Sequence, residues 1–130
     1  MTPLVFLHGF LGAPSMWQDV IAMTEHDGPV ESLLLPGHGL EPWLSAGETF
    51  EEVVDAVVRR IPFDEPALFV AYSMGARLAL GIAARHPGRV AGLVLVGVDP
   101  GLTTDGERRA RLLGRRAGPQ DRGMGALALR

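Results

Sequence analysis

The feature that most constrains this chain is an apolar run that stops at a serine. Residues 68–71 read LFVA, and Tyr72 and Ser73 follow them. A segment with helical character then begins at Met74 and continues to His86. A strand that turns tightly into a helix needs small residues two places before and after the serine, and here these are Ala71 and Gly75. The pattern predicts a nucleophile elbow, in which the serine side chain projects from the tip of the turn.

Continuous apolarity recurs along the chain and predicts further strands. Runs without alternation are typical of strands buried on both faces of a parallel sheet. Such runs cover Leu4–Leu7, Val30–Leu35, Ala67–Ala71 and Ala91–Val98. Turn residues follow each of them, including the glycine-rich loop from His8 to Gly12. Four strands, each followed by a loop, are therefore expected.

Helical segments separate these strands. A helix is predicted over residues 14–23, with Trp17, Val20 and Ile21 on one face. Thr49 and Glu52 form a capping box that opens a second helix, which Pro62 ends. Its buried face would carry Val53, Ala56, Val57 and Ile61. The third helix follows Ser73, and a fourth is expected over residues 104–116.

The alternation of strands and helices defines the fold class. It predicts an α/β protein with three layers, α/β/α, around a mainly parallel four-stranded sheet. We expect one domain over residues 1–116 and a poorly structured Gly/Arg-rich tail over residues 117–130. The apolar runs 30–35 and 91–98 would then form the edges of the sheet, and exposed edges favour self-association.

Composition limits the remaining classes. The 130 residues are 47% hydrophobic and 21% charged, with no cysteine, so neither disulfides nor a thiolate metal site is expected. No apolar run approaches the roughly 20 residues of a membrane span, and no export signal is evident at the N-terminus. We therefore expect a cytoplasmic protein that does not contact a membrane.

The charge is distributed unevenly. Residues 1–100 hold five arginines against twelve acidic residues, whereas residues 101–130 hold seven arginines against three. A basic end can bind nucleic acid. No aromatic platform accompanies these arginines, so an exposed helix followed by a disordered end is the better interpretation. No nucleic-acid partner is expected.

Three motifs in this order resemble the α/β-hydrolase superfamily: the loop His8–Gly12, the segment Pro36–Gly39 and the elbow at Ser73. The chain is most similar to the synthases of menaquinone biosynthesis that make 2-succinyl-6-hydroxy-2,4-cyclohexadiene-1-carboxylate by eliminating pyruvate. Arg77 and the segment from Pro100 to Arg111 carry this narrower resemblance. The resemblance implies a strand order of second, first, third, fourth, and a crevice at the C-terminal ends of the strands. It implies no cofactor and no metal.

The resemblance also implies roles for single residues. Ser73 would be the nucleophile or a partner of the base, and the backbone N–H groups of Phe10 and Met74 would form the oxyanion hole. His8 and Gly9 would belong to the substrate-binding surface, although an ordinary turn is the alternative for this dipeptide. Tyr72 would line the pocket, or serve only in packing.

Arginines are candidates for binding an anionic substrate. Arg77 lies one helical turn after Ser73, where a guanidinium could pair with a carboxylate of a polycarboxylate. A surface arginine on an exposed face is the alternative. Arg108 and Arg111 are further candidates for the same role.

The sequence departs from the superfamily pattern after the elbow. A reactive serine needs an imidazole base and a carboxylate that orients it, and in this superfamily both follow the serine. Asp99 could be the acid, although a turn residue before Pro100 is the alternative. His86 would cap or end its helix, while His8, His38 and His26 precede the serine in turns and loops.

Three interpretations of function remain open from the sequence. The chain is the core of a serine-dependent lyase or hydrolase, resembling the pyruvate-eliminating synthases. Alternatively, it is a carboxylic-ester or thioester hydrolase. A third possibility is a truncated or frame-shifted chain that is inactive and acts at most as a binding module.

Overall fold

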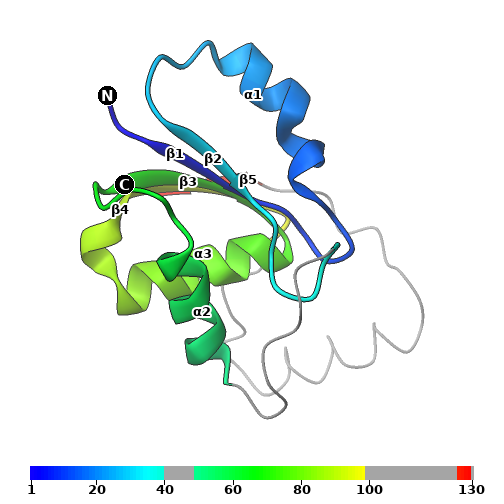
Figure 1. Cartoon of the computed structure of the whole chain (residues 1–130), viewed down its shortest axis with the longest axis vertical. Coiled ribbons are helices and arrows are strands. Elements are labelled where there is room, and N and C mark those ends of the chain that lie inside the picture. The colour runs from blue at the N-terminus through cyan, green and yellow to red at the C-terminus, as the bar shows by residue number, and fades with distance from the viewer. Residues whose placement is uncertain (40–48, 99–125, 130) are drawn as a thin grey trace.

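One mixed β-sheet forms the centre of the molecule (Figure 1). The computed structural model describes residues 1–39, 49–98 and 126–129. The strands lie in the order β2-β1-β3-β4-β5. Their bounds are β1 Leu4–Leu7, β2 Val30–Leu33, β3 Ala67–Tyr72, β4 Val90–Val96 and β5 Ala126–Leu129. Strands β1 to β4 are parallel and β5 is antiparallel to β4. The predicted order of the first four strands is therefore confirmed.

Helices cover both faces of the sheet. They are η1 Pro14–Trp17, α1 Gln18–Thr24, α2 Phe50–Arg59, α3 Met74–Arg85 and η2 Pro87–Arg89, where η marks a 3-10 helix. Figure 1 shows α1 on one face of the sheet, with α2 and α3 on the other. The predicted α/β/α layering is thus confirmed. No helix among the described residues is long and apolar enough to span a membrane.

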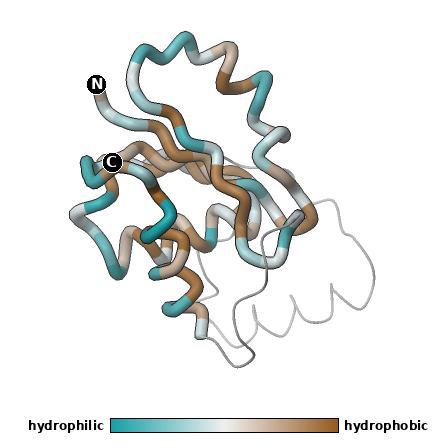
Figure 2. Tube along the Cα trace, in the orientation of Figure 1, coloured by the Kyte–Doolittle hydropathy of each residue, from teal (hydrophilic) through white to brown (hydrophobic). Residues whose placement is uncertain are grey.

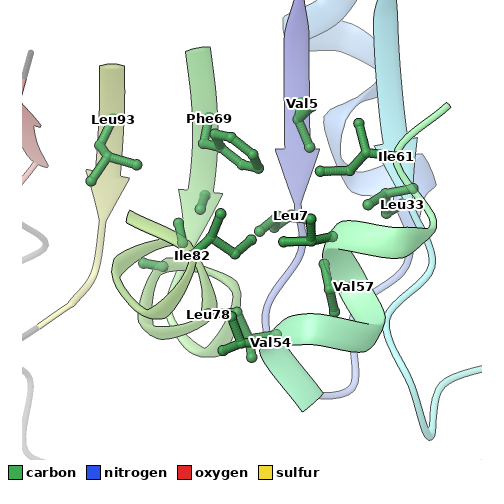
Figure 3. Close-up of a cluster of buried hydrophobic side chains, with 14 of the residues drawn as sticks. Val5, Leu7, Leu33, Val54, Val57, Ile61, Phe69, Leu78, Ile82 and Leu93 are labelled. Carbon is green, nitrogen blue, oxygen red and sulfur yellow. The ribbon is translucent and has the colours of Figure 1, made fainter. Parts of the chain in front are cut away.

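Alternate side chains of the central strands β1 and β3 enter two separate cores. Val5 and Leu7 of β1 and Phe69 of β3 pack toward α2 and α3, as Figure 3 shows. Leu4 and Phe6 point to the opposite face, where Phe6 meets Trp17 with ring centroids 5.3 Å apart. Hydrophobic residues accordingly run along the central strands in Figure 2. Burial on both faces explains why these strands read as continuous apolar runs.

The capping box that opens α2 is present. The Thr49 side chain accepts a hydrogen bond from the N–H of Glu52, and the Glu52 carboxylate accepts one from the N–H of Thr49. Ala56, Val57 and Ile61 are buried as predicted. Val54 is also fully buried, whereas Val53 is only partly so.

Two sequence-based expectations are wrong. The sequence predicts a poorly structured tail over residues 117–130, but Ala126–Leu129 form β5 and pair with residues 93–96 of β4, while residues 117–125 and 130 lie outside the described residues. The fourth strand is therefore not an edge, because β5 covers it. Val20 was assigned to the buried face of its helix, yet it is 42% exposed, while Trp17 carries the contact with the sheet.

Candidate active site

Ser73 lies at the junction between β3 and α3. Its backbone has φ 51° and ψ −110°, a conformation that residues with a side chain rarely adopt. Its N–H donates to the carbonyl of Val96 at 2.9 Å, and its carbonyl accepts from the N–H of Arg77 at 3.2 Å. Such strain costs of order 1–3 kcal/mol and persists only where the surrounding structure enforces it. The sequence-based elbow is therefore present.

Gly75 lets α3 approach β1 closely. A Cβ atom at this position would lie 2.5 Å from the carbonyl oxygens of both Leu7 and His8. No side chain fits there, so the start of α3 sits directly on the end of β1. The small residue two places after the serine is thus required by a neighbouring strand as well as by the turn itself.

The loop after β1 lies beside Ser73. A Cβ atom at Gly9 would come within 3.4 Å of the Ser73 Cβ. The loop then closes as a turn in which the Gly12 N–H donates to the Gly9 carbonyl at 3.0 Å. Leu11 has φ 61° within this turn, and the Phe10 side chain is 64% exposed. The glycine-rich loop and the serine therefore form one continuous site at the C-terminal edge of the sheet.

Two histidines join this loop to the loop after β2. His8 is fully buried, donates from Nδ1 to the Gly9 carbonyl at 2.8 Å, and accepts from the Leu35 N–H at Nε2 at 3.0 Å. His38 accepts from the Leu11 N–H at Nε2 at 2.9 Å, and its Nδ1 faces the Pro36 carbonyl at 3.1 Å. Each ring thus accepts a backbone hydrogen bond from the other loop. We call this arrangement the histidine clasp.

The environment of His8 favours the neutral ring. Burial lowers the pKa of His8 below its ordinary value, and the nearby His38 lowers it further, against an opposing effect of the hydrogen bond to Gly9. The two imidazoles meet edge to face with centroids 4.9 Å apart. Both nitrogens of His8 are engaged by backbone groups, so its ring does not reach a substrate. Its expected place on the substrate-binding surface is therefore not supported.

Tyr72 is held between two glycines. A Cβ at Gly9 would lie 2.7 Å from Tyr72 Cδ1, and a Cβ at Gly97 would lie 3.0 Å from Tyr72 Cε2. The ring is half-buried and packs with the cluster that contains Phe6 and Trp17. These contacts favour a packing role for Tyr72 over a place in the lining of a pocket.

Arg77 and Met74 follow the serine on α3. The Arg77 side chain is exposed and Met74 is half-buried. Ser73 makes no side-chain capping bond to α3, so its hydroxyl does not occupy the first N–H groups of the helix. Asp99, Arg108 and Arg111 lie outside the described residues, as does the helix expected over residues 104–116.

The remaining histidines have other surroundings. His86 follows α3 at the end opposite Ser73, and its Nε2 lies 2.6 Å from a carboxylate oxygen of Asp55. His26 lies in the loop between α1 and β2, with Nε2 buried and unbonded in the described part of the chain. His8 and His38 form the clasp. Over residues 1–39, 49–98 and 126–129, no three His, Asp or Glu side chains gather in a way that could hold a metal ion.

Comparison with known proteins identifies the family. Residues 2–118 match the sequence profile of the alpha/beta hydrolase fold. The chain is 37% identical over 107 residues to the pimeloyl-[acyl-carrier protein] methyl ester esterase of Aromatoleum aromaticum, covering 82% of this chain and 41% of that protein. It is 39% identical over 110 residues to the 2-succinyl-6-hydroxy-2,4-cyclohexadiene-1-carboxylate synthase of Enterobacter sp. (strain 638), covering 83% and 42%.

A solved structure agrees with these relatives. MenH from S. aureus superposes with a TM-score of 0.69 at 31% identity, covering 89% of this chain and 45% of that one. The chain therefore belongs to the alpha/beta hydrolase fold family. It spans about two fifths of the length of the two curated relatives described above.

Proposed function

We propose that the chain carries the nucleophile half of a serine-dependent enzyme of this family, with Ser73 as the reactive residue. The observation that supports this best is the φ of 51° at Ser73, between β3 and α3. Strain of this kind is concentrated at functional sites, where it fixes the direction of a reactive group. The Ser73 oxygen would attack a carbonyl carbon, and the electron pair of the carbonyl bond would move to its oxygen.

The developing negative oxygen would be bound by two backbone donors, the N–H groups of Phe10 and Met74. The N–H of Phe10 has no acceptor among the described residues. The N–H of Met74 opens α3, where the first amides lack partners within the helix and the helix dipole favours negative charge. Loss of one such donor typically costs about 3–4 kcal/mol of transition-state stabilisation.

For the substrate we propose a small carbonyl compound that carries carboxylates, as in the pyruvate-eliminating synthases. The support is Arg77, an exposed guanidinium one turn along α3, whose side chain makes no ion pair or hydrogen bond in the part of the chain that the structure describes. A guanidinium can bind a carboxylate through two parallel hydrogen bonds. An ester hydrolase is the second candidate, because the esterase relative matches this chain about as well as the synthase relative.

The acid and the imidazole base are not among the described residues near Ser73. In the reaction that the resemblance implies, the base removes the Ser73 proton as the oxygen attacks. Without that imidazole a site of this kind keeps only about 10³–10⁴-fold acceleration over water. We therefore propose that the reactivity of these 130 residues is low, and, as a separate claim that labelling tests, that Ser73 is the residue that reacts.

Labelling of the intact chain with a fluorophosphonate tests the proposal. Ser73 Oγ would form a bond to phosphorus, fluoride would leave, and the proton would pass to solvent. We expect mass spectrometry to place one phosphonyl group on Ser73, and Ser73→Ala to abolish it.

Ser15→Ala provides the matched control, since Ser15 is an exposed serine on η1. This variant should label at the wild-type rate. Equal labelling of wild type and Ser73→Ala, or modification of Ser15 instead, would exclude Ser73 as the reactive residue.

A further inference from the structure

The histidine clasp holds the peptide group that carries the Phe10 N–H. That group joins the carbonyl of Gly9 to the nitrogen of Phe10, and all described peptide bonds are trans. In a planar trans peptide the C=O and the N–H point in opposite directions. Whatever binds the Gly9 carbonyl therefore also sets the direction of the Phe10 N–H.

Two donors bind that carbonyl. His8 donates from Nδ1 at 2.8 Å, and the Gly12 N–H donates at 3.0 Å across the turn. The His8 ring in turn is fixed at Nε2 by the Leu35 N–H, which lies beyond β2. Strand β1 lies between β2 and β3 in the sheet. The His8 ring that binds the Gly9 carbonyl is itself held from the β2 side, so the Phe10 N–H, which points away from that carbonyl, would face the side of β3 and Ser73.

The peptide group between Phe10 and Leu11 is also bound by an imidazole, in this case through its N–H. The Leu11 N–H donates to His38 Nε2, and the Phe10 ring meets the His38 ring edge to face, with centroids 5.9 Å apart. The two peptide groups that flank Phe10 are thus both bound by imidazoles.

We propose that His8 is a positioning residue, which orients the Phe10 N–H toward the developing oxyanion by holding the Gly9 carbonyl. The inference rests on the proposed function of Ser73. His8 acts through Gly9 and touches no substrate. Its ring supplies two separate functions, a donor at Nδ1 and an acceptor at Nε2, and these can be removed one at a time.

Two variants separate these functions. In His8→Asn the side-chain NH₂ lies near the place of Nδ1 and can donate to Gly9, but the Leu35 N–H loses its acceptor. In His8→Gln the side-chain oxygen lies near the place of Nε2 and can accept from Leu35, but the donor to Gly9 is lost. A buried N–H without an acceptor is costly, whereas the Gly9 carbonyl keeps the bond from Gly12. His8→Asn should therefore unfold at the lower urea concentration.

The orientation of the peptide group between Gly9 and Phe10 should be kept better in His8→Asn, the less stable variant, than in His8→Gln. We expect His8→Asn to keep the wild-type carbonyl ¹³C shift of Gly9 and amide ¹⁵N shift of Phe10, and to label at Ser73 within about threefold of wild type. His8→Gln, the more stable variant, should move both shifts and label at least about tenfold more slowly, since loss of one oxyanion donor typically costs 10²–10³ in rate. If labelling and shifts instead follow stability, His8 is only structural and the proposal is overturned.

The nuclear magnetic resonance measurement stands independently of the labelling. If wild-type Ser73 does not label, the proposed function fails, while the shifts still decide what orients the peptide group. If neither variant folds, wild type itself provides the test. We expect scalar coupling across the hydrogen bond from the Leu35 amide to His8 Nε2, and a His8 ring protonated at Nδ1. A ring protonated at Nε2 would overturn the proposal.

Discussion

Ser73 combines a reactive side chain with a backbone conformation that suits glycine. A positive φ brings Cβ close to its own backbone, so the protein gains nothing in stability from a side chain at this position. The bonds to Val96 and Arg77 hold the peptide groups on either side and thereby enforce the conformation. The strained backbone therefore lowers the stability of the folded protein, and in return the side-chain hydroxyl stands at the tip of the turn.

At position 73 glycine should give a more stable protein than alanine, the reverse of the usual order in a helix or a 3-10 helix. Ser73→Gly removes the Cβ and relieves the strain, whereas Ser73→Ala keeps it. We expect the glycine variant to be more stable than the alanine variant by about 1 kcal/mol in urea unfolding. At Ser15, which lies in η1 with φ outside the positive region, the alanine variant should be the more stable one. If the alanine variant were the more stable one at Ser73 as well, Ser73 would not be strained.

Gly75 should tolerate no side chain. In Gly75→Ala the added methyl would overlap backbone oxygens of Leu7 and His8, which cannot move without displacing β1. We expect a loss of about 2–3 kcal/mol in the free energy of unfolding. Gly88→Ala is the matched control, because nothing lies within 4 Å of a Cβ there. A Gly75→Ala variant as stable as Gly88→Ala would contradict the close approach of α3 to β1.

Single residues were only partly predictable from the sequence. Small residues around Ser73 follow from local geometry, so Ala71 and Gly75 could be assigned from spacing alone. The roles of His8 and His38 could not, because each ring binds a backbone N–H that is 27 residues away in the chain. Tyr72 fits between Gly9 and Gly97, which lie in the segments after β1 and β4. Only the folded sheet brings such partners together.

At the scale of elements, one carboxylate connects α2 with the end of α3. Asp55 accepts two hydrogen bonds from Arg85, at 3.0 and 2.7 Å, and a third contact from His86 Nε2 at 2.6 Å. The bonds from Arg85, and next the contact with His86, hold the pKa of Asp55 well below its ordinary value of 3.8. A carboxylate whose pKa is lowered by folding stabilises the fold only while it is ionised.

This connection predicts a dependence of stability on pH. Asp55→Asn should unfold at a lower urea concentration than wild type at pH 7. The difference should be constant above about pH 5 and shrink as the pH falls below 3.8, through the lowered pKa of the folded state. Asp64→Asn is the control, because its carboxylate is fully exposed and 3.8 Å from Arg89. An Asp55→Asn deficit that stays constant down to pH 3 would contradict the connection.

The elements themselves were predictable where local signals are strong. The capping box at Thr49 and the helix after Ser73 depend on neighbours in sequence, and both are present. Strand β5 was missed because four small and medium apolar residues after glycine-rich text give no distinct period. Val20 is exposed because the contact of this segment with the sheet is made by Trp17, the last residue of η1, while α1 has no buried residue.

At the scale of the whole molecule, the layered arrangement followed from the alternation of strands and helices. Short strands of four to seven residues, most of them separated by helices, leave few topologies other than a parallel sheet covered on both faces. The fifth strand changes this picture at one edge only. Strand β5 pairs antiparallel with β4, so the sheet is mixed. Among the described strands, β2 and β5 therefore form the two edges, and β4 lies inside.

The position of β1 has a consequence for how the protein is made. During synthesis Leu4–Leu7 are made before both of their neighbours in the sheet, and one side of this strand pairs only with residues 68–71. Its other neighbour, β2, appears sooner, at residues 30–33. Until residues 68–71 have been made, the nascent chain therefore carries a half-paired apolar strand, the kind of segment that chaperones recognise. The junction at Ser73 can form only once β3 has paired with β1 and Val96 of β4 is available to accept the hydrogen bond from Ser73.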